Sequence, residues 1–264
     1  MDVFKGKRAL VTGASSGIGA AMALQLAAAG CDLVLVARRS DRLHDMAVRC
    51  SEAGAAHRIE CEVIAMDLLA HDAPHTLHRQ LRELDLPVDI LINNAGFGFQ
   101  QPLLALPLND HLRMIDLNVR TLTALTHLFA ADMVARGQGW ILQVGSVAGY
   151  LPIPGMATYA ATKAYVVSLG RALAEELRPQ GVVVSTLAPG GTETEFAEVA
   201  GQRIEGYKKA ALMSAERVAR DGLHGLARGR VVVVPGMLYK SSVGGARLLP
   251  ERWLTRLAGR VMKD

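Results

Sequence analysis

A tyrosine and a lysine four residues apart, Tyr159 and Lys163, are the first candidates for chemistry in this sequence. Residues at positions i and i+4 lie on one face of a helix, a turn apart, and the stretch around them favours a helix. A phenol beside an ammonium group ionises more easily, so it can donate or accept a proton near neutral pH. The pair is therefore a candidate general acid, although so short a motif also occurs by chance in ordinary helices.

A glycine-rich turn, TGASSGIG, runs from Thr12 to Gly19 between a predicted strand and a predicted helix. Glycines let the backbone turn tightly and approach a pyrophosphate, which the N-terminus of the following helix attracts. The strand, turn and helix context favours dinucleotide binding over a purely structural turn. The spacing is GxxxGxG and no GK[ST] follows, so a nucleoside-triphosphate P-loop is not expected.

The elements that must position these residues alternate along the chain. Short, mostly apolar runs predict strands at residues 8–12, 32–37, 62–66, 89–93, 139–144, 182–187 and 231–234. Helical patterns predict helices at residues 17–29, 40–53, 74–84, 109–136, 158–178 and 214–227. This alternation predicts a doubly wound α/β domain over residues 1–236, with about seven parallel strands and helices on both faces, and a C-terminal extension over residues 237–264.

Five motifs together resemble the short-chain dehydrogenase/reductase family. The glycine turn is followed by NNAG at residues 93–96, by Ser146 thirteen residues before the Tyr159 and Lys163 pair, and by PGGTET at residues 189–194. The motifs fall in order after the first, fourth, fifth and sixth predicted strands. The resemblance covers about residues 5–236. It implies a Rossmann-type fold and hydride transfer between a nicotinamide cofactor and a carbonyl or alcohol.

The resemblance implies catalytic roles for four residues. Tyr159 would protonate the carbonyl oxygen as hydride arrives at its carbon, or take the hydroxyl proton in the reverse reaction, and Ser146 would hold the substrate oxygen. Lys163 would hydrogen-bond the nicotinamide ribose and, with the positive nicotinamide, lower the pKa of Tyr159 from its usual value of about 10. Asn118 resembles the helix asparagine that positions a water in the proton relay. Asparagine is a poor helix former, which favours a functional role over a solvated position.

The choice of cofactor depends on the end of the second predicted strand, where the sequence reads VARRSDR. An acidic residue there would bind the ribose hydroxyls of NAD. Arg38 and Arg39 stand in its place, and a guanidinium suits a 2′-phosphate. We therefore predict NADP, with NAD as the alternative, even though the glycine turn carries Ser15 and Ser16 where NADP-preferring relatives often have a basic residue. Asp67 resembles the aspartate that meets the adenine ring, and its alternative role is a strand-end cap.

The residues predicted to bind the cofactor come from the glycine turn, from the ends of the strands and from the catalytic helix. They are Gly13, Ser15, Ser16, Gly17, Ile18, Gly19, Arg38, Asp67, Leu68, Asn94, Ala95, Gly96, Tyr159, Lys163, Pro189, Gly190, Thr192 and Thr194. None of these positions is predicted to bind a metal.

Two other constellations give weaker signals. His71, His75 and His78 have a spacing that could hold a metal, but they fit better as the polar side of a helix that begins near residue 74. The stretch VGSVAG fails the GxSxG pattern because Val144 replaces its first glycine, so Ser146 is not expected to be a nucleophile.

The composition allows a sizeable core and argues against several classes of protein. Of the 264 residues 50% are hydrophobic, and three cysteines without a CxxC pair argue against a disulfide framework. No signal peptide or membrane-spanning run is seen, so a cytoplasmic protein is expected. Residues 240–264 carry six basic and two acidic side chains, which accounts for the whole net charge of +4. A basic face for nucleic acid over the body of the protein is therefore not expected.

The substrate is expected to be a small lipophilic carbonyl or alcohol. Phe97 and Phe99 follow NNAG, and residues 150–156 and a loop over residues 192–213 add mainly apolar linings. No residue specifies which compound is used. The catalytic set argues against a non-catalytic dinucleotide-binding regulator, and the glycine spacing argues against a lyase or epimerase that uses the same tyrosine. A homodimer or homotetramer is the expected assembly.

Residues 250–264 predict a basic amphipathic helix. One half of its helical wheel carries Trp253, Leu254, Leu257, Ala258, Val261 and Met262, and the other carries Arg252, Arg256, Arg260 and Lys263. The apolar face is expected to pack on the parent domain or a second subunit. The alternative is that it enters an anionic membrane surface, which would place the protein peripherally at the inner membrane.

Overall fold

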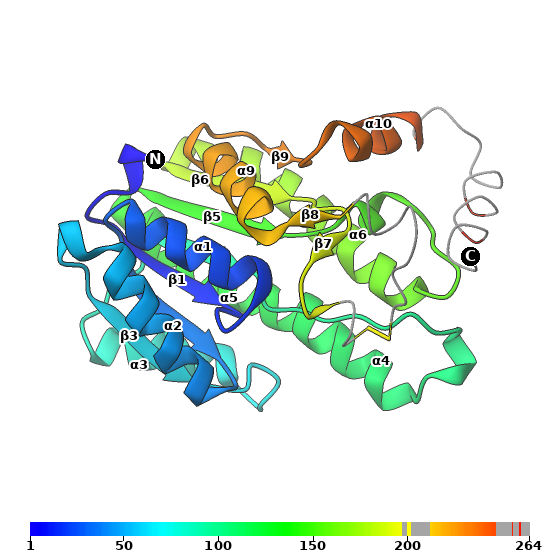
Figure 1. Cartoon of the computed structure of the whole chain (residues 1–264), viewed down its shortest axis with the longest axis horizontal. Helices are drawn as coiled ribbons and strands as arrows, with labels where there is room; N and C mark the ends of the chain where they lie inside the picture. The colour runs from blue at the N-terminus through cyan, green and yellow to red at the C-terminus, as the bar shows by residue number, and fades with distance from the viewer. Residues whose placement is uncertain (197–199, 202–211, 247–254, 256–258, 260–264) are drawn as a thin grey trace.

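Seven parallel strands form the main sheet in the order β3-β2-β1-β4-β5-β6-β9 (Figure 1). In chain order they are β1 (Arg8–Thr12), β2 (Asp32–Ala37), β3 (Cys61–Ala65), β4 (Ile90–Asn93), β5 (Gly139–Val144), β6 (Val182–Leu187) and β9 (Val232–Val233). The structure is a computed structural model that describes residues 1–196, 200–201, 212–246, 255 and 259. The strand order reverses between β1 and β4, and ligands of open α/β sheets bind beyond the carboxyl ends of the strands at such a point.

Helices cover both faces of this sheet. One face packs against α1 (Gly17–Ala28), α2 (Ser40–Ala53) and α9 (Ala215–Ala227). The other packs against α3 (Ala73–Glu83), α5 (Leu122–Arg136) and α6 (Ala157–Glu176). The predicted single doubly wound Rossmann-type α/β fold is therefore confirmed.

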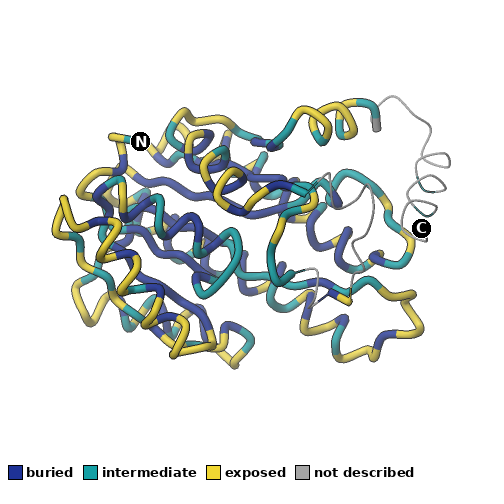
Figure 2. Tube along the Cα trace, viewed as in Figure 1, coloured by how far each residue is buried: buried dark blue, intermediate teal, exposed yellow. Residues whose placement is uncertain are grey.

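Adjacent residues of one strand face opposite cores. Val11 of β1 packs in the core on the α1 side, whereas its neighbour Leu10 packs in the core on the α3 side, and both are fully buried. Figure 2 shows the strands as a buried layer beneath helices with exposed outer faces. A strand buried on both sides needs apolar residues at every position, which explains why the strand signals in the sequence are continuous rather than alternating.

The helix predicted over residues 109–136 is divided in the structure. It consists of α4 (Leu108–Ile115), a π-helical turn (Asp116–Thr121) and α5. A π-turn holds one residue more than an α-helical turn and is common at functional sites. The hydrophobic pattern changes too little over one turn for the sequence to reveal it.

Beyond β6 the described chain forms the strands β7 (Thr192–Glu193) and β8 (Met213–Ser214), which pair with each other, and the helix α10 (Met237–Ala246). The predicted amphipathic helix at residues 250–264 lies outside the described residues except for Thr255 and Gly259, which are helical. Its binding partner and the domain boundary at residue 236 stay predictions. Among the described residues, no helix has the length and apolar character needed to cross a membrane.

Candidate active site

Tyr159 and Lys163 lie on one buried face of α6. Their exposed fractions are 8% and 5%, and Lys163 Nζ lies 5.9 Å from the centre of the Tyr159 ring. Lys163 Nζ also donates a hydrogen bond to the carbonyl oxygen of Val144 at 2.8 Å, at the carboxyl end of β5. The lysine thus joins α6 to the end of a central strand.

Ser146 lies two residues after β5 and caps a short 3-10 helix (Val147–Tyr150). Its hydroxyl accepts a hydrogen bond from the Ala148 N–H at 3.1 Å and donates one to the Pro189 carbonyl at 3.4 Å. It also lies near Tyr159, where it opposes the rise that burial causes in the pKa of the phenol. The serine hydroxyl and the tyrosine therefore lie close to each other beyond the end of β5.

Burial dominates the protonation of the tyrosine and the lysine. It raises the pKa of Tyr159 to about 12, and the nearby Ser146 only partly opposes this. Burial also lowers the pKa of Lys163 to about 8. The charged form of each group is disfavoured because water is excluded. The expectation that Lys163 and a nicotinamide lower the tyrosine pKa concerns the loaded site, and in the chain alone the net shift has the opposite sign.

Asn118 is fully buried in the π-helical turn. Its Oδ1 accepts from the Phe97 N–H at 3.1 Å, and its Nδ2 donates to the Phe97 carbonyl at 2.8 Å and to Thr162 Oγ1 at 3.1 Å. Thr162 Oγ1 in turn donates to the Tyr159 carbonyl at 2.8 Å. The asparagine therefore fixes the segment after NNAG against the catalytic helix.

Gly96 lies between the asparagine and the lysine. A Cβ at this position would lie 2.9 Å from Asn118 Oδ1 and 3.4 Å from Lys163 Nζ. Only a residue without a side chain allows both polar groups to approach this closely. The structure thus brings Asn118 and Lys163 together around Gly96, with Tyr159 on the same helix face as the lysine.

The glycine turn is clamped by the residues that follow β4. Asn94 Nδ2 donates to the carbonyl oxygens of Thr12 at 2.9 Å and Gly13 at 3.2 Å. Thr12 Oγ1 accepts from the N–H groups of Asn94 and Ala95, both at 3.0 Å. Gly13 has φ of +66°, and a Cβ on Gly19 would lie 2.4 Å from Asn94 Nδ2. The side-chain amide of Asn94, which was predicted to bind the cofactor, therefore holds the glycine turn in place. Thr12 is a second residue that holds the turn, and it was not predicted from the sequence.

The turn leaves the N-terminus of α1 free of side-chain capping. Ser16 is the N-cap residue and makes no capping hydrogen bond with its side chain, although serine is well suited to that task. Ile18 packs partly buried against the core beneath the turn. A helix N-terminus with uncapped N–H groups and a close glycine backbone fits a pyrophosphate.

Arg39, and not Arg38, is the arginine that lies against the glycine turn. Arg39 Nη2 lies 3.3 Å from both Ser15 Oγ and Ser16 Oγ. Arg38 is exposed and forms no ion pair with any described residue. The sequence shows that two arginines follow β2, but it does not show which of their side chains points toward the glycine turn.

Two further predicted residues lie after β3. Asp67 is exposed, and its Oδ1 accepts from the Leu69 N–H at 3.0 Å, while its contact with an adenine ring stays a prediction. Leu68 is buried, and its carbonyl accepts from Thr121 Oγ1 at 3.0 Å.

The PGGTET segment after β6 contacts α10. A Cβ on Gly190 would lie 2.2 Å from the ring of Tyr239, and the Gly191 N–H donates to the Tyr239 hydroxyl at 3.0 Å. Thr192 Oγ1 donates to the Gly190 carbonyl at 3.1 Å, and Thr194 lies against the glycine turn. Tyr239 is a further contact that the sequence reasoning missed, because it is distant in the chain.

A small cavity with both apolar and polar lining residues lies beside Tyr159. The apolar ones include Phe99, Leu106, Met114 and Met156, and the polar ones include Gln101 and Thr158. Three of these side chains, Leu106, Met114 and Met156, belong with Tyr159 to a separate buried cluster, against which Phe97, Phe99, Ile153 and Phe196 pack. The cavity is also lined by His111, another residue not predicted, whose Nδ1 lies 2.8 Å from Thr158 Oγ1 and whose Nε2 lies 3.0 Å from the Leu103 carbonyl.

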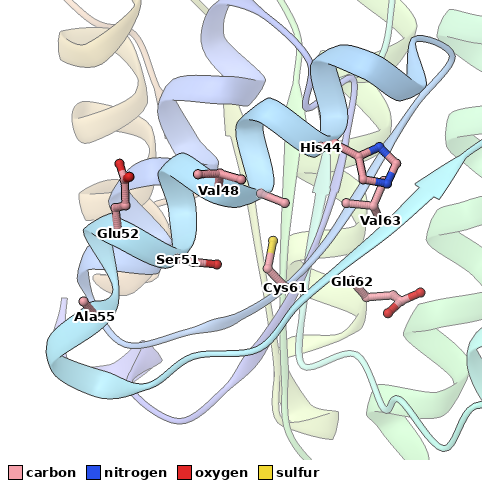
Figure 3. A pocket seen from close by; sticks show the side chains of 9 residues that line it. His44, Val48, Ser51, Glu52, Ala55, Cys61, Glu62 and Val63 are labelled. Carbon is pink, nitrogen blue, oxygen red and sulfur yellow. The ribbon is translucent and has the colours of Figure 1, made fainter.

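Other features lie apart from this site. A surface groove of about 770 Å³ runs between α2 and β3 (Figure 3), and none of the predicted site residues lines it. His75 pairs with Asp72 and His78 pairs with Asp132, each at 2.7 Å. Within the described ranges, no group of three or more possible ligand side chains could hold a metal ion.

Comparison with known proteins agrees with this geometry. The short chain dehydrogenase family model matches residues 7–205. The very-long-chain 3-oxoacyl-CoA reductase of Homo sapiens is 30% identical over 246 residues, covering 89% of this chain and 77% of the relative.

Two solved structures share both fold and sequence with the chain. A short-chain dehydrogenase from Sphingobium yanoikuyae in complex with NADPH superposes with a TM-score of 0.82 at 35% identity, covering 92% of this chain and 94% of that one. The bulky-bulky ketone specific alcohol dehydrogenase from Comamonas testosteroni has a TM-score of 0.77 at 31% identity, covering 94% and 98%. The chain therefore belongs to the short-chain dehydrogenase/reductase family of oxidoreductases.

Proposed function

We propose that the protein is an NADP-dependent oxidoreductase that interconverts a carbonyl and an alcohol on a lipophilic substrate. The observation that carries the proposal is the buried pair of Tyr159 and Lys163 on one face of α6, with Ser146 near the tyrosine. Two hydroxyls close to each other in a buried site can hold one substrate oxygen between them.

The residues at the carboxyl ends of β1 and β4 fit a dinucleotide. The glycine turn is too close to Asn94 for any side chain at Gly19, and the helix that follows begins without a side-chain cap. A bound nicotinamide cofactor would supply or accept the hydride. Lys163, whose ammonium is buried beside Gly96, is the group of this chain that can hold the nicotinamide ribose.

Tyr159 is suited to the role of general acid. Because burial raises its pKa to about 12, the phenol carries its proton throughout the neutral range. Ser146 is placed to orient the substrate oxygen toward that proton. Asn118 holds the NNAG segment and α6 at a fixed separation, so the proton donor keeps its position.

NADP is favoured over NAD by the charge at the end of β2. Arg38 and Arg39 replace a carboxylate there, and Arg39 lies against the serines of the glycine turn. The Sphingobium yanoikuyae relative, which is 35% identical, binds NADPH in its crystal. A bidentate guanidinium supports binding of a 2′-phosphate.

A lipophilic substrate is favoured by the apolar cluster around Tyr159. Phe97, Phe99 and Phe196 pack against the buried cluster that contains Tyr159 and Met156. Two relatives have names that describe large substrates, a very-long-chain acyl thioester and a bulky-bulky ketone. The lining therefore supports a bulky carbonyl compound over a small polar one.

The proposal is tested by following NADPH absorbance with a panel of ketones, 3-oxoacyl thioesters and their alcohols. Turnover of a bulky apolar carbonyl by the parent protein, and its loss in Tyr159→Phe, are expected. A protein that binds NADPH but reduces none of these compounds would instead be a dinucleotide-binding regulator.

A further inference from the structure

The segment that follows β7 crosses the predicted cofactor site at three consecutive residues. The Thr194 methyl lies 3.0 Å from the position that a Cβ on Gly17 would occupy. Glu195 pairs with arginines beside the glycine turn, and the Phe196 ring lies 5.4 Å from the Tyr159 ring. One short segment thus contacts both the predicted adenosine end and the catalytic end of the site.

Glu195 is held by two guanidinium groups at once. Its Oε2 lies 3.2 Å from Arg39 Nη1 and 3.3 Å from Arg39 Nη2, and its Oε1 lies 2.5 Å from Arg42 Nη1. Arg39 Nη2 also reaches the hydroxyls of Ser15 and Ser16. Two guanidinium groups bind this anion, and two hydroxyls lie beside one of them, an arrangement that suits a phosphate as well as a carboxylate.

We infer that Glu195 is a specificity-determining residue whose carboxylate occupies the place of the 2′-phosphate in the cofactor-free protein and competes with it for Arg39 and Arg42. The inference rests on the proposed use of NADP. A phosphate monoester carries between one and two negative charges near neutral pH, more than one carboxylate, so it displaces Glu195 from the arginines. NAD has no group that can do so, and Glu195 then keeps its place.

The charge of Glu195 supports this competition. The hydrogen bond from Arg42, together with Arg39, lowers the pKa of the carboxyl group, so it stays ionised at neutral pH. The three side chains are 41–43% exposed, and exposed ion pairs are weak and screened by salt. Glu195 therefore acts as a moderate competitor that NADP can displace.

The test compares Glu195→Gln with Glu193→Gln by isothermal titration calorimetry. Glu193 is exposed on β7, two residues away, and forms no ion pair with a described residue, so it controls for the lost charge. For Glu195→Gln, the dissociation constants of NADPH and of adenosine 2′,5′-bisphosphate should fall about three- to tenfold, in keeping with weak exposed pairs. The dissociation constant for NADH should not change, and the increase in affinity for NADPH should become smaller at high salt.

Each contrary result identifies what is wrong. A parent protein that binds NADPH and NADH equally overturns the proposed cofactor and with it this inference. A parent that prefers NADPH, combined with unchanged constants in Glu195→Gln, overturns the inference alone. An equal increase in NADPH affinity in Glu195→Gln and Glu193→Gln would show a general effect of the lost charge. Weaker NADH binding in Glu195→Gln would show that the carboxylate binds the ribose hydroxyls. Either result also overturns competition by Glu195.

Discussion

Lys163 Nζ donates a hydrogen bond of 2.8 Å to the carbonyl oxygen of Val144, so a buried ammonium is held by one strand-end carbonyl. Nearby, Gly96 leaves room for this group and for Asn118 but adds no charge. A cation with so few compensating partners is costly to bury. The site therefore carries a free-energy penalty that a bound cofactor can relieve.

This penalty should appear in the pH dependence of stability. The pKa of Lys163 is about 8 in the folded chain and about 10.5 when unfolded, so the folded state loses the proton first as the pH rises. The unfolded state then binds more protons, and folding is favoured by increasing pH between these values. The free energy of unfolding of the parent, relative to Lys163→Met, should rise by about 2 kcal/mol between pH 7 and pH 10.

Urea unfolding of both proteins without cofactor measures this difference. The Tyr159 pKa of about 12 lies above the range, so the phenol remains protonated in the folded state. Other groups that titrate equally in the parent and in Lys163→Met contribute equally to both free energies of unfolding, so their contributions cancel in the difference. A difference that stays constant from pH 7 to pH 10 would show that Lys163 is not desolvated.

Tyr159→Phe removes the proton donor and keeps the ring that packs on Phe196. Turnover should fall by about 10² to 10⁴-fold, with the affinity for NADPH nearly unchanged. Tyr165→Phe is the matched control, because Tyr165 lies on the same helix and its hydroxyl is 2.8 Å from Thr123 Oγ1 on the surface. Parental activity in Tyr159→Phe would mean that the proton comes from another group.

The arginines at the end of β2 should set the cofactor preference. The parent should bind NADPH at least tenfold more tightly than NADH, about 1.4 kcal/mol. Arg39→Ala should reduce this ratio more than Arg38→Ala, since only Arg39 is held against the serines of the turn. Calorimetric titration of both cofactors checks this, and Arg38→Asp should narrow the ratio further or reverse it. The prediction would be wrong if none of these arginine substitutions changed the ratio of the NADH and NADPH dissociation constants.

Asn118→Ala should destabilise the fold as well as impair catalysis. It would leave both the N–H and the carbonyl of Phe97 without their side-chain partner, at about 1–3 kcal/mol for each group that stays buried. Thermal unfolding measures the loss, and Asn109→Ala, at an exposed position of α4, serves as the control. Equal stability of the two variants would argue that Asn118 is held by neither contact.

The sequence predicted the sheet well because its strands are buried on both faces. Continuous apolar runs such as Val182–Leu187 leave little ambiguity, and the observed bounds differ from the predicted ones by no more than one residue per end. The four predicted catalytic residues were chosen because their spacing is characteristic of the family, and their roles stay predictions. What could not be predicted depends on side-chain direction and on distant segments. Examples are the turn of Arg39 toward Ser15, and the packing of Tyr239 on the PGGTET segment.

The π-helical turn at Asp116–Thr121 makes the length of this segment as important as its composition. Deleting one residue there would restore regular α-helical winding and leave α4 and α5 nearly in phase, but it would change the directions of the side chains within the turn. Asn118 would then lose its contacts with Phe97 and Thr162, whereas His111 and Met114 on α4 would keep their places in the cavity lining. Engineering of substrate scope on α4 should therefore leave the length of this turn unchanged, because an insertion or deletion there displaces Asn118.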